Sequence, residues 1–315
     1  MSVIKKQEQK AAKEAKTSKK SAPGPEQPGA RRLRTGILVP TAIEAEAYFQ
    51  LWPDLELYST SPWQMYRREE AGQTITLILS FIGPANAAAA AEHLIGLGLD
   101  RLFNSGSAGA IDPLLLPGDI VLGSSCKILC SREILAVRRS LVMAVTPIRY
   151  MKNGQSVYKE ELAADDHLLT AAEQVAEKLL PRWSAWPAAG WPTEEAPRQA
   201  RLQTAAIGSL DGWTKGLENL NFIRDNFAVA AEDMESAYVA QIAAIHDLPF
   251  LAVRAISNNE YRQTLEREEI FPAVKAAAHR AASLVIELVN SANSSSSACS
   301  ANAASSANSA TTNCR

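Results

Sequence analysis

Three acidic residues surround a methionine where an apolar segment ends, in Val229-Ala-Ala-Glu-Asp-Met-Glu-Ser-Ala-Tyr238. Apolar residues then recur at helical spacing until Leu248-Pro249, which predicts that Glu235 lies in a first helical turn. The positive end of a helix dipole favours an ionised carboxylate, which accepts hydrogen bonds from two adjacent hydroxyls. A vicinal diol such as that of ribose fits this chemistry. The alternative is that Glu235 only completes a helix start.

The elements that position this segment alternate along the chain. Strands are predicted at 36–39, 75–80, 101–104, 118–123, 202–207, 228–231 and 249–256, and helices at 43–51, 86–98, 165–180, 215–226, 235–247 and 266–289. Several strands are continuously apolar, as expected when both faces are covered. The pattern predicts one α/β domain with a mixed, largely parallel sheet.

Ligands of such sheets bind beyond the carboxyl ends of the strands, so the residues that follow apolar runs are candidates for a site. Four junctions qualify: Pro40–Glu44, Ser80–Pro84, Asn104–Gly109 and Ser257–Asn259. Asn104–Gly109 is predicted to be a tight turn whose small residues let backbone N–H groups approach a ligand. It has neither the Gly-Lys-Ser/Thr of a phosphate-binding loop nor a dinucleotide fingerprint.

Composition separates the two ends of the chain from its body. Residues 1–34 hold ten Lys or Arg against three Glu, a net charge of +7, so the remainder carries −9 of the overall −2. We expect 1–34 to be a disordered basic tail, 35–290 a catalytic domain, and the Ser/Ala/Asn-rich 291–315 a disordered tail. The acidic body argues against nucleic-acid binding.

The remaining classes of partner and cofactor are also constrained. No apolar run is long enough to cross a bilayer and no secretory signal is present, so we expect no membrane contact and a cytoplasmic protein. Four cysteines and four histidines are scattered without metal-ligand spacing, so no metal and no cofactor are expected.

Taken in order, the junctions resemble the nucleoside phosphorylase and nucleosidase superfamily. The matching segments are Gly36–Glu44, Ser80–Ala88, Asn104–Ala110 with Pro117–Val121, Glu232–Ala237 and Val253–Asn258. The resemblance covers roughly 35 to 290 and implies a three-layer α/β/α sandwich, a purine nucleoside as substrate, and a homo-oligomer, often a dimer.

In detail the chain resembles the branch of methylthioadenosine/adenosylhomocysteine nucleosidases and futalosine hydrolases, which cleave the N-glycosidic bond with water. The resemblance implies that Glu44 activates the water, that Met234 lies beneath the ribose, and that Glu235, with Ser80, binds the sugar. A carboxylate near the sugar stabilises the oxocarbenium charge as the base leaves. Glu46 competes with Glu44 for the role of base, although two residues along a helix it points elsewhere.

Water rather than phosphate is expected as the nucleophile. Phosphate-using relatives carry an arginine at the start of the Gly-Ser turn, where this chain has Asn104, followed by Ser105, Gly106 and Ser107. Arg101 lies three residues upstream, and we expect it to be a surface side chain.

The residue at 258 decides the base. Adenine-specific nucleosidases of this branch end the strand with Ser-Asp, whereas this chain has Ser257-Asn258. A carboxamide offers N–H donors to O6 and N7 of a 6-oxopurine, so Asn258 favours hypoxanthine and, within the branch, futalosine of the alternative menaquinone pathway. Alternatively Asn258 faces away, and Asn259 or Asp211 contacts the base.

Three further questions stay open in the sequence. Trp213 is either a residue that stacks on the base or part of the core. The Pro/Trp-rich insertion 181–192 either covers the site or packs against a partner subunit. The alternative activities are a methylthioadenosine/adenosylhomocysteine nucleosidase that releases adenine and an inactive nucleoside-binding protein.

Overall fold

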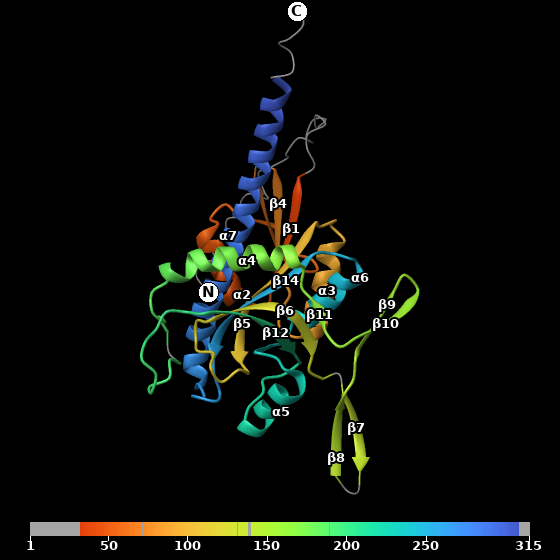
Figure 1. Ribbon diagram of the computed structural model, residues 1–315, viewed down its shortest axis with the longest axis vertical. Helices are drawn as coiled ribbons and strands as arrows, with labels where there is room; N and C mark the ends of the chain where they lie inside the picture. Colours follow the sequence, from red (N-terminus) through yellow and green to blue (C-terminus); the bar gives the residue numbers. More distant parts are fainter. Residues whose placement is uncertain (1–31, 71, 131, 138–139, 189, 309–315) are drawn as a thin grey trace, which may run out of the picture.

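A computed structural model describes residues 32–308, except 71, 131, 138–139 and 189. Within this part of the chain a ten-stranded mixed sheet forms the centre of the molecule (Figure 1). Its strands are β1 (Leu33–Val39), β2 (Glu56–Ser59), β3 (Gln64–Glu70), β4 (Gln73–Leu79), β5 (Arg101–Ala110), β6 (Ile120–Ile128), β11 (Leu162–Ala163), β12 (Leu202–Ser209), β13 (Ala231–Asp233) and β14 (Phe250–Asn258).

The sheet is open at one side and closed on itself at the other. From β2 to β5 the order is β2-β3-β4-β1-β5, and the β1 pairs are parallel. Beyond β5 the strands form a ring, because β14 pairs with both β5 and β6 while β13 joins β12 back to β5. Closure brings the ends of β5, β13 and β14 together. β5 and β14 carry two of the four junctions described above, and β13 leads into the acidic segment that ends at Glu235.

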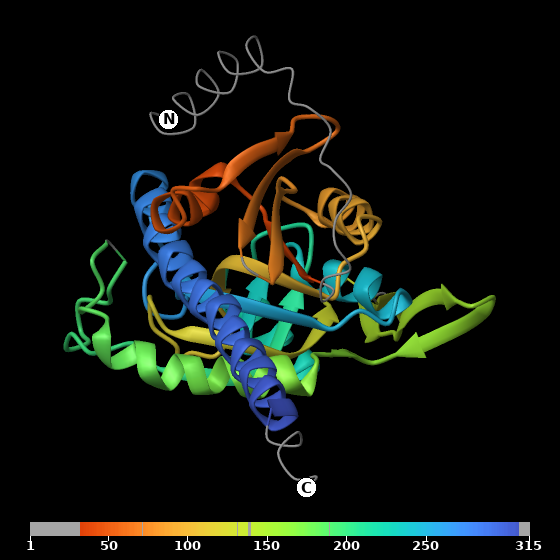
Figure 2. The same ribbon diagram turned by 90° about the horizontal axis from the view of Figure 1, so that it is seen from above.

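Helices cover both faces of the sheet (Figures 1 and 2). On one face lie α2 (Ala42–Leu51), α4 (Asp166–Leu179) and the long α7 (Arg267–Asn308), and on the other α3 (Pro84–Ile95) and α6 (Ser236–Ile245). Each face has its own buried cluster of aliphatic side chains. A short α5 (Leu217–Phe227) lies beyond the strand ends. The predicted three-layer α/β/α architecture is confirmed.

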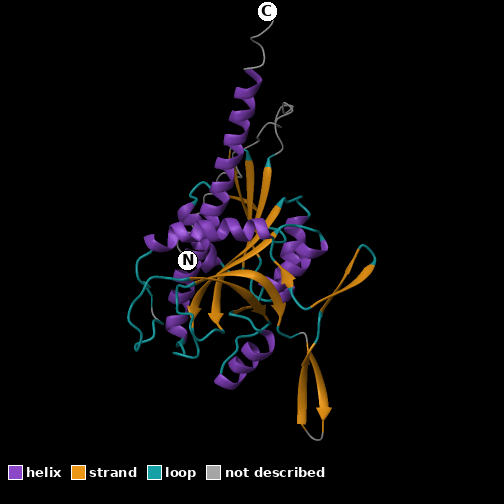
Figure 3. Cartoon of the chain, viewed as in Figure 1, coloured by secondary structure: helices purple, strands orange, loops and turns teal. Residues whose placement is uncertain are grey.

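Several elements escaped prediction because they are polar or at the edge of the sheet. β3 has the sequence QMYRREE and β2 is the outermost strand, so neither forms an apolar run. Two hairpins, β7 (Arg132–Val137) with β8 (Ser140–Val145) and β9 (Ile148–Lys152) with β10 (Gln155–Lys159), project from the body (Figure 3).

The ends of the chain are only partly described. The boundary expected at 290 falls inside α7, which extends to Asn308. The basic segment expected over 1–34 lies outside the described residues up to 31, and β1 begins at Leu33. No helix in the described part of the chain is long and apolar enough to span a bilayer.

Candidate active site

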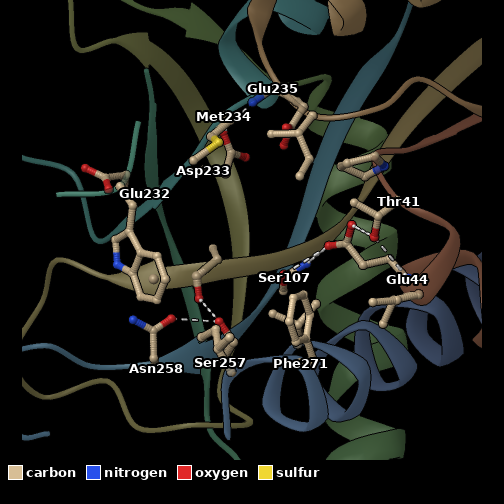
Figure 4. A pocket seen from close by; sticks show the side chains of 18 of the residues that line it. Thr41, Glu44, Ser107, Glu232, Asp233, Met234, Glu235, Ser257, Asn258 and Phe271 are labelled. Atoms are coloured by element: carbon tan, nitrogen blue, oxygen red, sulfur yellow. Dashed lines mark hydrogen bonds between the residues drawn. The ribbon is translucent and has the colours of Figure 1, made fainter. Parts of the chain in front are cut away.

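A cavity of about 420 Å³ opens at the carboxyl ends of β5, β13 and β14 (Figure 4). The start of α2 and the first turns of α7 complete its walls. Six of the residues predicted from the sequence line it: Glu44, Ser107, Trp213, Met234, Glu235 and Asn258. Segments up to about 200 residues apart in the chain therefore meet around one space, as expected for ligand sites in α/β sheets.

Glu44 is held rigidly at one side of the cavity. Its Oε1 accepts from the backbone N and the Oγ of Ser107, at 2.8 and 3.0 Å, and its Oε2 accepts from Thr41 Oγ1 at 2.8 Å. Thr41 is the N-cap of α2 and also accepts from the backbone N of Glu44, so the start of the helix fixes the carboxylate. Glu46 instead pairs with Lys275 of α7 at 3.0 Å and does not line the cavity.

Arg254 organises the charges beneath the cavity. Its side chain is fully buried, with Nε 2.7 Å from Asp233 Oδ2 and Nη2 3.5 Å from Glu235 Oε2. Asp233 in turn accepts from the backbone N of Glu235 and from that of Ser236. Its carboxylate thus satisfies two free N–H groups at the start of α6. A buried guanidinium between two carboxylates compensates the charges that burial alone would penalise.

Residues 104–106 belong to β5, and the prediction of a tight turn over 104–109 is wrong. β5 continues to Ala110 because it pairs with β14 on one edge and with β13 at its end. Asn104 is buried and accepts from Arg254 Nη2 and from Ser236 Oγ. A Cβ at Gly106 would lie 2.5 Å from Arg254 Nη1 and 2.7 Å from Glu44 Oε1. The small residues therefore admit charged side chains from neighbouring elements rather than a turn.

Glu235 occupies the N-cap position of α6, one residue before the helix. Its Oε1 accepts from the backbone N of Gly83 at 3.1 Å. Burial raises the pKa of Glu235 to about 8, against the lowering effect of Arg254. This direction is the reverse of the one expected from the helix dipole, because desolvation of the carboxylate outweighs the field of the helix terminus.

The opposite side of the cavity carries neutral groups. Asn258 is buried at the end of β14, with Oδ1 2.8 Å from Ser257 Oγ and Nδ2 3.3 Å from Glu260 Oε1. Asn259 donates to the carbonyls of Pro113 and Leu115, so its amide supports a loop and is not available to the cavity. Asp211 is exposed and does not line the cavity.

Trp213 lines the cavity and keeps 40% of its surface exposed, which excludes the alternative of a core tryptophan. Ser80 and Ser105 are buried, and neither lines the cavity. Ser80 donates to the carbonyl of Phe81 instead. No group of three or more His, Cys, Asp or Glu side chains with metal-binding geometry occurs among the residues that the structure describes.

Comparison with known proteins identifies the family. The model of the phosphorylase superfamily matches residues 34–290. The chain belongs to this superfamily.

Proteins similar to this chain are named as nucleosidases or as futalosine hydrolase. The 5'-methylthioadenosine/S-adenosylhomocysteine nucleosidase of Haemophilus ducreyi is 26% identical over 82% of this chain and 99% of its own. The crystal structure of the Neisseria meningitidis nucleosidase of the same name, with methylthio-immucillin-A, is also 26% identical, with a TM-score of 0.62 over 82% of this chain and 99% of that one. Futalosine hydrolase of Helicobacter pylori has a TM-score of 0.63 at 17% identity, covers 82% of this chain and 98% of that one, and shares the fold.

The superfamily member contains site residues that its sequence did not reveal. Arg254 is the one charged residue of β14, but its partner Asp233 is distant in sequence, so its role in the site could not be read from the strand. Phe271 and Ile270 of α7 reach the cavity from a helix whose pattern predicts only packing. Arg101, expected at the surface, is buried at the amino end of β5, donates to Thr35 Oγ1 at 2.9 Å, and lies far along the strand from the cavity.

The described residues of the insertion 181–192 do not line the cavity, and two of its tryptophans contact α7. The guanidinium of Arg280 in α7 lies 5.4 Å from the ring centroids of both Trp183 and Trp186. It also donates to the carbonyls of Gly118 and Ser184. These two tryptophans therefore contact α7 and do not cover the cavity, and the alternative of a partner interface stays a prediction.

Proposed function

We propose that this protein hydrolyses the N-glycosidic bond of a purine nucleoside. The observation that carries the proposal is that Glu44 and Glu235, each fixed by hydrogen bonds, face a single cavity that Trp213 and Asn258 line from the other side. A nucleoside has a sugar with hydroxyl groups and a flat base. The two carboxyl groups suit the sugar, and the aromatic ring and the amide suit the base. The nucleosidase names of the relatives agree with this assignment.

In this proposal Glu44 is the general base. Three hydrogen bonds from Thr41 and Ser107 orient its carboxylate, and a positioned carboxylate takes a proton from water as it attacks. Glu235 accepts the ribose hydroxyls, with Met234 against the sugar. As the base leaves, positive charge develops on the sugar ring, and the Glu44 carboxylate stabilises it electrostatically while Glu235 holds the ribose through hydrogen bonds.

Water fits the cavity better than phosphate does. None of the described residues that line the cavity is a lysine or an arginine, so a phosphate dianion would find no cation at the surface of the cavity. The nearby Arg254 is already paired with Asp233 and Glu235. Asn104, where phosphate-using relatives are expected to carry arginine, contributes a neutral amide that binds Arg254.

We further propose that the base is hypoxanthine and the substrate futalosine. Asn258 lies buried in the cavity wall and carries N–H donors, which complement the acceptors O6 and N7 of a 6-oxopurine. The same hydrogen bonds stabilise negative charge on the departing base. Trp213 offers a ring face for stacking.

The second candidate is hydrolysis of methylthioadenosine or adenosylhomocysteine. It is favoured by the sequence relatives, which carry this name at 24–28% identity over 81–82% of the chain. Adenine presents an amino group at position 6, so it needs an acceptor there. Under this alternative, Asn258→Asp leaves adenine release intact or raises it.

A direct assay separates these reactions. The purified protein is incubated with futalosine, with its 6-amino analogue and with methylthioadenosine, in buffer without phosphate, and released bases are quantified by chromatography. We expect hypoxanthine from futalosine as the fastest reaction. Faster release of adenine from methylthioadenosine than of hypoxanthine from futalosine would favour the second candidate. The absence of base release from all three substrates would reject hydrolysis.

A further inference from the structure

The orientation of the Asn258 amide is the feature on which base selection depends. A carboxamide that turns by 180° about its last side-chain bond exchanges a donor for an acceptor. With N–H toward the base it complements a 6-oxopurine, and with C=O toward the base it complements a 6-aminopurine. A residue that fixes this angle therefore controls specificity, and the inference rests on the proposed nucleosidase function.

Ser257 does not fix the angle. Its Oγ lies 2.8 Å from Asn258 Oδ1 and 3.2 Å from the carbonyl oxygen of Ala108, yet a hydroxyl has a single proton. When that proton is donated to Ala108, the oxygen of Ser257 can accept from an amide N–H just as well. Both orientations of Asn258 are thus compatible with this neighbour.

Packing does not fix the angle either. Gly109 lies opposite Asn258 in the register of β5 and β14. A Cβ at Gly109 would lie 3.7 Å from Nδ2 and 3.8 Å from Oδ1 of Asn258, so the two ends of the amide meet nearly the same surroundings there.

Glu260 does distinguish the two orientations. Its Oε1 lies 3.3 Å from Asn258 Nδ2, and its Oε2 accepts from Thr264 Oγ1 at 2.8 Å. An ionised carboxylate only accepts hydrogen bonds, so it attracts the NH₂ end of the amide and repels the carbonyl end. One N–H of Asn258 is used by Glu260, and the second has no acceptor among the residues that the structure describes.

The loop that carries Glu260 is itself anchored. Asn259 accepts from the backbone N of Tyr261 and donates to two carbonyls of the segment 113–115. Arg262 pairs with Glu195 at 3.6 Å, just beyond the insertion 181–192. Inside the insertion, a Cβ at Gly190 would lie 2.9 Å from Leu265, so the insertion packs tightly against this loop. Glu260 is thus presented from a supported segment.

We propose that Glu260 is a specificity-determining positioning residue, whose carboxylate turns the Asn258 amide so that an N–H faces the purine and a 6-oxopurine is selected over a 6-aminopurine. Glu260 does not line the cavity, so it acts on the base through Asn258.

The test compares Glu260→Gln with the full-length parent, because glutamine has the same shape and can donate as well as accept. Binding of free hypoxanthine and free adenine is measured by calorimetry, and hydrolysis of futalosine is compared with that of its 6-amino analogue. We expect the preference for hypoxanthine to fall by about tenfold in Glu260→Gln, since one hydrogen bond of this kind is worth roughly that factor. Thr264→Val removes the hydrogen bond that holds Glu260 Oε2, so it should lower the preference for hypoxanthine by a smaller factor.

Glu266→Gln is the matched control, because it removes the same charge from the same loop at an exposed position, and Glu266 does not hydrogen-bond to Asn258. Its base preference should equal that of the parent. An unchanged preference in both Glu260→Gln and Thr264→Val, with hypoxanthine still bound by the parent, overturns the inference and leaves the proposed function intact. Binding of neither base by the parent overturns both.

Discussion

The two halves of the cavity are built by different means. In the proposed sugar half, Glu235 and Asp233 both pair with the fully buried Arg254. Glu44, in the same half, is held by hydrogen bonds from Ser107 and Thr41. The base half, with Trp213 and Asn258, uses neutral side chains on loops and strand ends, supported by Glu260. Buried charge pairs are sensitive to loss of one member, whereas neutral contacts tolerate exchange. We therefore expect substitutions in the proposed sugar half to lower the stability of the fold more than substitutions in the proposed base half.

Loss of the buried cation should produce the largest effect. Arg254→Met leaves Asp233 and Glu235 buried without compensation, which we expect to lower the free energy of unfolding by about 3–5 kcal/mol. Urea unfolding of Arg32→Met serves as control, because the exposed pair of Arg32 with Glu69 should contribute about 0–1 kcal/mol. Equal effects of the two substitutions would remove the distinction between the halves.

The proposed general base gives the next largest effect. Glu44→Gln keeps the shape of the side chain but cannot take a proton, so kcat should fall on the order of 10²-fold or more while KM changes little. Glu46→Gln, which loses only the pair with Lys275, should retain near-parental kcat. Steady-state assays of base release measure both variants. A retained kcat in Glu44→Gln contradicts its assignment as base. Nucleoside binding without any turnover in the parent would instead favour a binding protein.

The sugar half should also respond to pH. Because burial raises the pKa of Glu235 from 4.5 to about 8, the folded protein binds more protons than the unfolded chain between these values. Stability contributed by this group is therefore full below about pH 4.5 and is lost as pH rises toward 8, at up to about 1.4 kcal/mol per pH unit. In urea unfolding across this range, the free energy of unfolding should fall less steeply with pH in Glu235→Gln than in the parent. Equal slopes in the two proteins would contradict a buried, protonated Glu235.

The smallest effect is expected in the base half. Trp213→Leu removes an aromatic face but leaves an apolar side chain, and we expect KM for the nucleoside to rise about fivefold, in line with roughly 1 kcal/mol for an aromatic contact. Stability should be unchanged, since Trp213 is partly exposed. A loss of stability comparable with that of Arg254→Met would mean that the base half also supports the fold.

The sequence predicted those parts of the molecule that depend on local pattern. Continuous apolar runs located most central strands, and polar residues after them pointed to the edge where Glu44, Met234, Glu235 and Asn258 now meet. The length of β5 escaped prediction, because small residues typical of a turn also suit a strand that accommodates bulky neighbours.

Long-range electrostatics escaped prediction as well. The direction of the Glu235 pKa depends on burial by segments distant in sequence, and a helix start alone indicates the opposite sign. The burial of Arg101 and Arg254 escaped prediction too, because the partners that each arginine contacts, Thr35 and Asp233, lie on other strands.

Thr41 serves two purposes with one hydroxyl. It begins α2 by accepting from the backbone of Glu44, and it donates to the carboxylate of the same residue. The start of the helix and the orientation of the proposed general base therefore depend on the same hydroxyl. A replacement that removes this hydroxyl to improve heat tolerance would also remove the hydrogen bond that orients the Glu44 carboxylate, so Thr41 is a poor position for stabilising substitutions.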